Sequence, residues 1–185
     1  MPQTLRLFTG LALEYHLRRN LDLMLEHLRP LAPLHWSPID KFHITTKFIG
    51  PWPAERLDEL KAALAALEPR GPIITPISGF GWFPNPHHPR VLFAGVQAPP
   101  SLFDLAARLD ASCARLGLAP DPRAYRPHLT LARVRGSVDL APLRHAIAQL
   151  PSADFGVSSA ARLLLYKSEP GEHTSIYTVI GDYPL

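Results

Sequence analysis

The sequence has little cysteine and no long apolar run. Cys113 is the single cysteine among 185 residues, so the chain cannot form an internal disulfide and offers no cysteine cluster for a metal. Near the N-terminus, Arg6 and Glu14 interrupt the apolar stretches, and no other segment comes closer to a signal peptide or a membrane span. We therefore expect a cytoplasmic protein with no membrane partner.

Lysine is also scarce. Four lysines stand against fifteen arginines, and the formal net charge is +3. Planar guanidinium groups suit phosphate recognition better than ammonium groups do, so the composition fits a partner that carries phosphate. The alternative is that the arginines reflect genomic base composition, because alanine, leucine and proline are abundant too.

Apolar residues recur at alternating strand and helix spacings, with no low-complexity linker between them. The spacing predicts helices over 17–28, 53–69, 101–117 and 140–150, the third with Ser101 and Asp104 as a capping box. It predicts strands over 5–13, 42–48, 72–80, 90–96, 127–133, 161–168 and 175–181, with the turn-rich segment 81–89 as a long hairpin tip.

Each half of the chain thus shows strands, one strand marked by histidine, and then a helix. This weak internal symmetry predicts an α+β fold in which two pseudo-symmetric lobes each contain an antiparallel sheet with helices on its outer face. At this length the two lobes form a single domain over residues 1–185, with a cleft between them. We expect the protein to be a monomer.

The two marked strands carry His-x-Thr triplets, "FHITTKF" at 42–48 and "PHLTLAR" at 127–133. Strand alternation places His43, Thr45 and Lys47 on one face, opposite the face of Phe42, Ile44, Thr46 and Phe48. Random placement gives about 0.4 such triplets in this composition. One histidine alone is better explained as a structural strand residue, but two in corresponding places favour a shared function.

Two imidazoles and two hydroxyls that meet across a cleft suit a phosphodiester. Displacement at phosphorus needs a base near the incoming oxygen and an acid near the departing one. Two imidazoles can fill both roles without a metal, and threonine hydroxyls can donate hydrogen bonds to the nonbridging oxygens.

The motifs "FHITTKFIG" and "RPHLTLAR" resemble the paired HxTx motifs of the 2H phosphoesterase superfamily, and most of all its RNA 2',3'-cyclic phosphodiesterases, also called 2'-5' RNA ligases. The resemblance covers nearly the whole chain. It implies a bilobal fold with pseudo-twofold symmetry, a metal-free site without cofactor, and opening of cyclic phosphate ends of RNA, or of cyclic nucleotides, to 2'-phosphomonoesters.

The resemblance also assigns roles to single residues. It implies that His43 protonates the departing 3'-oxygen and that His128 activates water, while Thr45 and Thr130 hold phosphate oxygens. It further implies that Arg133 binds the phosphate. Simple alternation places Arg133 on the leucine face, so the strand has to end or bulge near Ala132.

Other candidates have weaker support. Phe8 and Tyr166 are candidates for a sandwich around a nucleobase, or else are core aromatics. Lys47 shares a strand face with His43 and is a further substrate-binding candidate, its ammonium being able to reach solvent. The segment "NPHHPR" is expected to be an exposed loop that contacts RNA through Arg90, because its histidines have no carboxylate or thiol at ligand spacing. The remaining histidines are expected on the surface or on helices: His16, His27, His35, His145 and His173.

Two rival functions remain open. One is an RNA-end-binding module without turnover, although binding alone does not require an acid and base pair. The other is a 2'-5' RNA ligase that uses the same residues in reverse. The sequence has no nucleotide-binding glycine-rich loop, so such ligation would be independent of ATP.

Overall fold

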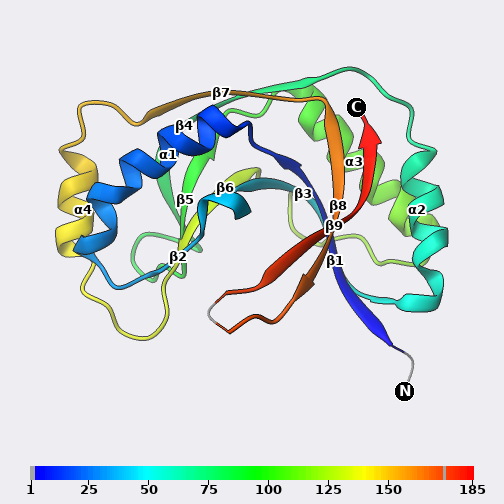
Figure 1. Cartoon of the computed structure of the whole chain (residues 1–185), viewed down its shortest axis with the longest axis horizontal. Helices are drawn as coiled ribbons and strands as arrows, with labels where there is room; N and C mark the ends of the chain where they lie inside the picture. Colours follow the sequence, from blue (N-terminus) through cyan, green and yellow to red (C-terminus); the bar gives the residue numbers. More distant parts are fainter. Residues whose placement is uncertain (1–2, 173) are drawn as a thin grey trace.

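The computed structural model describes residues 3–172 and 174–185 (Figure 1). The strands are β1 (Thr4–Ala12), β2 (His35–Trp36), β3 (His43–Pro53), β4 (Ile73–Phe83), β5 (Val91–Val96), β6 (His128–Arg133), β7 (Asp154–Ala160), β8 (Arg162–Glu169) and β9 (Ile176–Pro184). The helices are α1 (Tyr15–Leu28), α2 (Leu57–Ala65), α3 (Pro100–Arg115) and α4 (Ala141–Ala148), and short 3-10 turns cover Arg29–Leu31, Ile39–Lys41 and Ala54–Arg56.

The strands pair antiparallel in the order β7-β4-β5-β6-β3-β1-β8-β9, and β2 adds to β6. The two marked strands, β3 and β6, are neighbours at the middle of this order, where Ile44 pairs with Leu129. The predicted α+β class with antiparallel strands is therefore confirmed. The division into two lobes stays a prediction.

The helices lie in two pairs at opposite ends of the molecule (Figure 1). Helix α1 packs on β7 and α4, whereas α3 packs on β3 and α2. The predicted apolar face of α1 is confirmed, because Leu17, Leu21, Leu25 and Leu28 are buried. The helices that the structure describes include none long and apolar enough to cross a membrane.

Three local predictions need correction. Helix α3 begins at Pro100 after Pro99, with no side-chain cap, and Asp104 accepts hydrogen bonds from Arg70 and Arg108 instead of forming a capping box with Ser101. Strand β4 continues to Phe83, through part of the expected hairpin tip. The short strand β2 and the edge strand β7 were not predicted.

Candidate active site

The two His-x-Thr motifs lie side by side because β3 and β6 pair at the central residue of each motif, Ile44 with Leu129. His43, Thr45, His128 and Thr130 are half-buried. The residues between them, Ile44 and Leu129, are fully buried in the core. The alternation predicted for these positions is therefore confirmed.

Both imidazoles are held by the same backbone contact. The Nδ1 atom of His43 lies 2.7 Å from the carbonyl oxygen of Lys41, and Nδ1 of His128 lies 2.7 Å from that of Arg126. A carbonyl oxygen only accepts hydrogen bonds, so each Nδ1 carries the proton and donates it. Each Nε2 is consequently the unprotonated nitrogen, and Nε2 of His43 accepts a hydrogen bond from the Thr45 hydroxyl over 3.1 Å.

A β-bulge follows the threonine in each motif. In the β5–β6 ladder, Phe93 pairs with Thr130 and Leu92 with Ala132, so Leu131 is the extra residue. Leu131 and Ala132 are both fully buried, and Arg133 is returned to the exposed face. This is the bulge that a phosphate-binding role for Arg133 requires.

The equivalent bulge in β3 corrects the predicted alternation. In the β1–β3 ladder, Gly10 pairs with Thr45 and Thr9 with Lys47, so Thr46 is the extra residue. Thr46 is buried and its hydroxyl lies 2.8 Å from that of Thr9. Beyond the bulge the faces are exchanged, and Phe48, expected on the apolar face with Ile44, is 49% exposed.

The expectation that the Lys47 ammonium reaches solvent is wrong. Its side chain is buried, and its ammonium group forms an ion pair with Asp110 of α3. This pairing satisfies the charge that burial would otherwise leave uncompensated.

Burial and positive neighbours lower the pKa of both histidines. Desolvation is the main cause of the lowered pKa of His43, and the positive charges of His128 and Arg133 add to it, against the hydrogen bond to Lys41, which raises the pKa. Desolvation also dominates the lowered pKa of His128, with contributions from the charges of Arg133 and Arg126, against the raising effect of its backbone bond. Both imidazoles therefore favour the neutral form in the free protein.

An aromatic cage surrounds His43. The ring centroids of Phe8, Tyr166 and Tyr177 lie 4.9, 5.7 and 5.5 Å from that of His43. Gly10 leaves room for this packing, since a Cβ there would lie 3.0 Å from the carbonyl oxygen of Ile44 and 3.4 Å from Cδ2 of His43.

Of the two alternatives for Phe8 and Tyr166, the cage favours core aromatics over a base sandwich. Phe8 and Tyr166 are 5% and 8% exposed and stack on each other with centroids 4.8 Å apart, so no base fits between them. Their contacts fit a role in holding His43. Tyr177 was missed because nothing in its strand sequence shows which strand it pairs with.

His128 has a more open setting. The ring centroids of Phe83 and Phe93 lie 4.8 and 5.6 Å from that of His128, and the guanidinium of Arg126 lies 4.6 Å above the Phe83 ring. His128 and Thr45 are among the residues that line a cavity of about 740 Å³. It extends between the residues that follow the β3 bulge, the start of β5, helix α3 and the segment 121–126.

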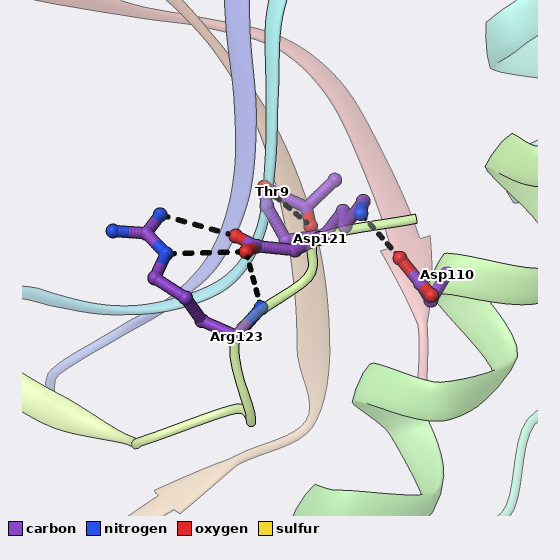
Figure 2. Close-up of polar contacts among 5 residues, drawn as sticks. Thr9, Asp110, Asp121 and Arg123 are labelled. Atoms are coloured by element: carbon purple, nitrogen blue, oxygen red, sulfur yellow. Dashed lines mark hydrogen bonds and ion pairs between the residues drawn. The ribbon is translucent and has the colours of Figure 1, made fainter. Parts of the chain in front are cut away.

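Two cations on the cavity wall are bound by carboxylates. Arg123 is bound to Asp121 by two side-chain contacts, each 3.2 Å long (Figure 2). The Lys47 ammonium is bound to Asp110. The guanidinium of Arg123 holds the pKa of the Asp121 carboxyl below its usual value. Arg90 and Arg126, which also line the cavity, form no ion pair with any carboxylate in the described part of the chain.

The other histidines take no part in this site. His87 and His88 lie in an exposed turn, where their backbone N–H groups donate to the Asn85 side chain over 3.0 Å. Within residues 3–172 and 174–185, no three His, Cys, Asp or Glu side chains form a group suited to a metal ion. The predicted surface positions are confirmed for His16, His27, His35 and His145, and His173 lies outside the described residues.

Comparison with known proteins gives consistent matches. A family model described as the 2'-5' RNA ligase superfamily matches residues 19–169. The chain is 30% identical over 175 residues to an RNA 2',3'-cyclic phosphodiesterase of Methanothermobacter thermautotrophicus, covering 94% of this chain and 95% of the relative. It is 31% identical over 152 residues to one of Geobacillus stearothermophilus, covering 81% of this chain but 47% of that longer relative.

A solved structure shows the same fold. The crystal structure of Escherichia coli LigT complexed with 3'-AMP aligns over 99% of both chains with a TM-score of 0.82 and 23% identity.

Proposed function

Because the chain belongs to the 2'-5' RNA ligase superfamily, we propose that it is an RNA 2',3'-cyclic phosphodiesterase, which opens cyclic phosphate ends of RNA to 2'-phosphomonoesters. The names of the relatives support the reaction class. The observation that carries the proposal is the pair of imidazoles, each with Nδ1 bonded to a backbone carbonyl oxygen, which leaves Nε2 as the nitrogen that can accept a proton.

The proposed reaction is a displacement at phosphorus. Nε2 of His128 accepts a proton from water, the water oxygen bonds to phosphorus, the bond from phosphorus to the 3'-oxygen breaks, and Nε2 of His43 donates a proton to that oxygen. His43 has to gain its proton first. The lowered pKa opposes this in the free protein, and the negative charge of the bound phosphate favours it.

Three further side chains stabilise the phosphate in this proposal. Protonation of His43 makes its Nε2 a donor and frees the Thr45 hydroxyl proton. The hydroxyls of Thr45 and Thr130 then donate hydrogen bonds to the nonbridging oxygens, and Arg133 compensates the charge that grows in the transition state. The phosphate-binding role of Arg133 is supported by its electrostatic effect on both histidines, because its positive charge lowers the pKa of each.

The proposal needs no metal, because the two imidazoles can carry out both proton transfers. The whole chain would act as one bilobal domain and as a monomer, with the site in the cleft between its lobes.

The test is turnover of a 2',3'-cyclic mononucleotide in EDTA, with the product identified by phosphorus NMR. We expect a 2'-monophosphate, formed by the unaltered chain and by the control His145→Ala, which changes an exposed histidine of α4. Binding without turnover would establish the RNA-end-binding module instead. Joining of a 5'-hydroxyl end to the cyclic phosphate would add the ligase reaction, and turnover that depends strictly on a divalent ion would overturn the mechanism.

A further inference from the structure

Lys41 contacts His43 and a distant segment of the chain at the same time. Its backbone carbonyl oxygen accepts the hydrogen bond from Nδ1 of His43 over 2.7 Å. Its side-chain ammonium donates to the hydroxyl of Thr174 and, over 2.7 Å, to the backbone carbonyl oxygen of Ser175, just before β9. Lys41 therefore joins the histidine to a segment 133 residues along the chain.

The segment that Lys41 binds leads directly to an aromatic neighbour of His43. Tyr177 is the second residue of β9, and its ring lies edge-on to the His43 imidazole, with centroids 5.5 Å apart. The same ring packs edge to face against Phe8, with centroids 5.0 Å apart. The place of the Tyr177 ring in the cage thus depends on how the first residues of β9 are held.

We propose that Lys41 is a positioning residue, which holds residues 174–177 so that Tyr177 stays packed on the imidazole of His43. The inference rests on the proposed function, because that function makes His43 the proton donor. Lys41 need not touch the substrate in this role, since it acts through the tyrosine.

The beginning of β9 needs such a contact because the sheet holds it weakly. Strand β9 is the last in the sheet order of the described residues, next to β8, where Tyr177 is opposite Ser168. Ile176 and Val179 are 52% and 49% exposed, so this part of the strand buries little apolar surface. Segments of that kind open locally at a low cost in free energy, and the two bonds from Lys41 oppose such opening.

The tyrosine cover affects the protonation of His43. Desolvation is the main cause of its lowered pKa, and the Tyr177 ring is part of the surroundings that exclude water. The charged and titratable groups near His43 are Lys41 itself, Tyr166 of β8, Tyr177 of β9, and His128 and Arg133 of β6. A substitution of Lys41 leaves the two β6 groups in place, so the pKa of His43 reports the cover.

The first experiment measures the pKa of both histidines in the free protein. NMR follows the imidazole C–H signals through a pH titration, with His43→Gln and His128→Gln to assign them. Lys41→Met removes the ammonium and keeps the backbone carbonyl that binds Nδ1. We expect it to raise the pKa of His43 toward its ordinary value, because water reaches the ring, and to change that of His128 much less. Lys41→Arg keeps a long cationic donor and should retain the lowered pKa.

A second pair of variants tests whether Lys41 acts through the tyrosine. Tyr177→Ala should also raise the pKa of His43, and the double variant Lys41→Met/Tyr177→Ala should match Tyr177→Ala, because the ammonium then has no ring to position. Steady-state kinetics should show kcat lowered several-fold in Lys41→Met, with a smaller change in KM, because the proton donor is misplaced. The control is Lys61→Met, which changes a lysine of α2.

The outcomes separate this inference from the proposed function. An unchanged pKa of His43 in Lys41→Met would overturn the positioning role, even if cyclic phosphates are hydrolysed. Additive shifts in the double variant would overturn it too, because Lys41 would then act through its own charge. A shift confined to His43, absent from Lys41→Arg and not increased in the double variant beyond Tyr177→Ala, supports the role even if no cyclic phosphate is turned over.

Discussion

The two His-x-Thr strands share the backbone contact of the histidine and the place of the bulge. In each, the histidine Nδ1 donates to the carbonyl oxygen two residues earlier, over 2.7 Å, and the bulge follows directly after the threonine. The cation at that earlier position contacts a neighbouring hairpin in both halves. The ammonium of Lys41 bonds to Thr174 and Ser175 before β9, and the guanidinium of Arg126 lies over Phe83 at the end of β4.

The strands differ beyond the bulge. Five residues after the histidine, β6 has Arg133 and β3 has Phe48, and both side chains are exposed. One position earlier, β6 has the fully buried Ala132 and β3 has Lys47, paired with Asp110. On the proposed function, the residues before the bulge serve the shared acid and base chemistry, whereas the position five residues after the histidine carries a phosphate-binding cation in β6 and an exposed aromatic ring in β3.

The largest expected effect on activity comes from removing either histidine, the residue type that both motifs share. His43→Ala and His128→Ala should each lower kcat by about 10² to 10⁴, the usual contribution of a positioned acid or base. On the proposed mechanism the two groups act as a unit, so the double variant should lose far less than the product of the two single losses. Steady-state kinetics on a cyclic mononucleotide measures this, and full activity in either single variant would return that histidine to a structural role.

A leaving-group test then distinguishes the two histidines. A substrate with p-nitrophenol in place of the 3'-oxygen needs no acid, so it should rescue His43→Ala and leave His128→Ala impaired. Rescue of His128→Ala alone would mean that the roles are reversed.

The next prediction concerns Arg133 of β6, at the position that Phe48 has in β3. Arg133→Ala should lower kcat/KM by about 10- to 100-fold, because a charge-assisted contact to phosphate is lost. Arg133→Lys should recover only part of this, since an ammonium group cannot bind two phosphate oxygens in a fork. Arg135→Ala, two residues along and also exposed, is the control. If Arg133→Ala and Arg135→Ala lower kcat/KM equally, the effect comes from general positive charge and not from the position of Arg133.

The pH dependence of kcat/KM tests whether the pKa values of both histidines are lowered and whether Arg133 contributes to both shifts. Since the pKa of each is lowered below 6.5 in the free protein, the bell of kcat/KM should have its maximum below pH 6.5, with rates falling about tenfold per pH unit on the outer limbs. Arg133→Gln removes a cation that lowers both pKa values, so it should move both limbs to higher pH. A profile that is flat from pH 5 to 9 would count against the pair.

The sequence predicted the part of the site that depends on alternation alone. His43, Thr45, His128 and Thr130 face the site because the period of two holds up to each threonine. It fails at Thr46, where the bulge exchanges the faces of Lys47 and Phe48. The bulge near Ala132 was predictable only because a role for Arg133 required it.

Other features depend on contacts between distant segments. Asp110 lies 63 residues from Lys47, and Tyr177 reaches His43 from the last strand, so neither contact has a local sequence signal. The Phe8 and Tyr166 pair was recognised as aromatic residues near the site. Their stacking on each other follows from the pairing of β1 with β8, where the two residues are opposite each other.

The smallest predicted effect concerns a bond that joins the two halves. The hydroxyl of Tyr125, three residues before His128, donates to the backbone carbonyl oxygen of Thr45 over 2.9 Å, beside the β3 bulge. Burial raises the pKa of Tyr125 far above its usual value, so the hydroxyl stays a donor throughout the pH range of the enzyme. The bond ties the backbone of one motif to the approach of the other.

Removing that hydroxyl should loosen the two motifs relative to each other. Tyr125→Phe keeps the ring and should lower the free energy of unfolding by about 0.5 to 1.5 kcal/mol, the net contribution of one such hydrogen bond. It should also lower kcat several-fold, because misplacing one motif affects proton transfers that require both. Urea denaturation and kinetics measure the two effects, with Tyr15→Phe as the exposed control. A loss of stability with unchanged kcat would mean that each histidine is positioned within its own half, by its backbone bond and its aromatic neighbours.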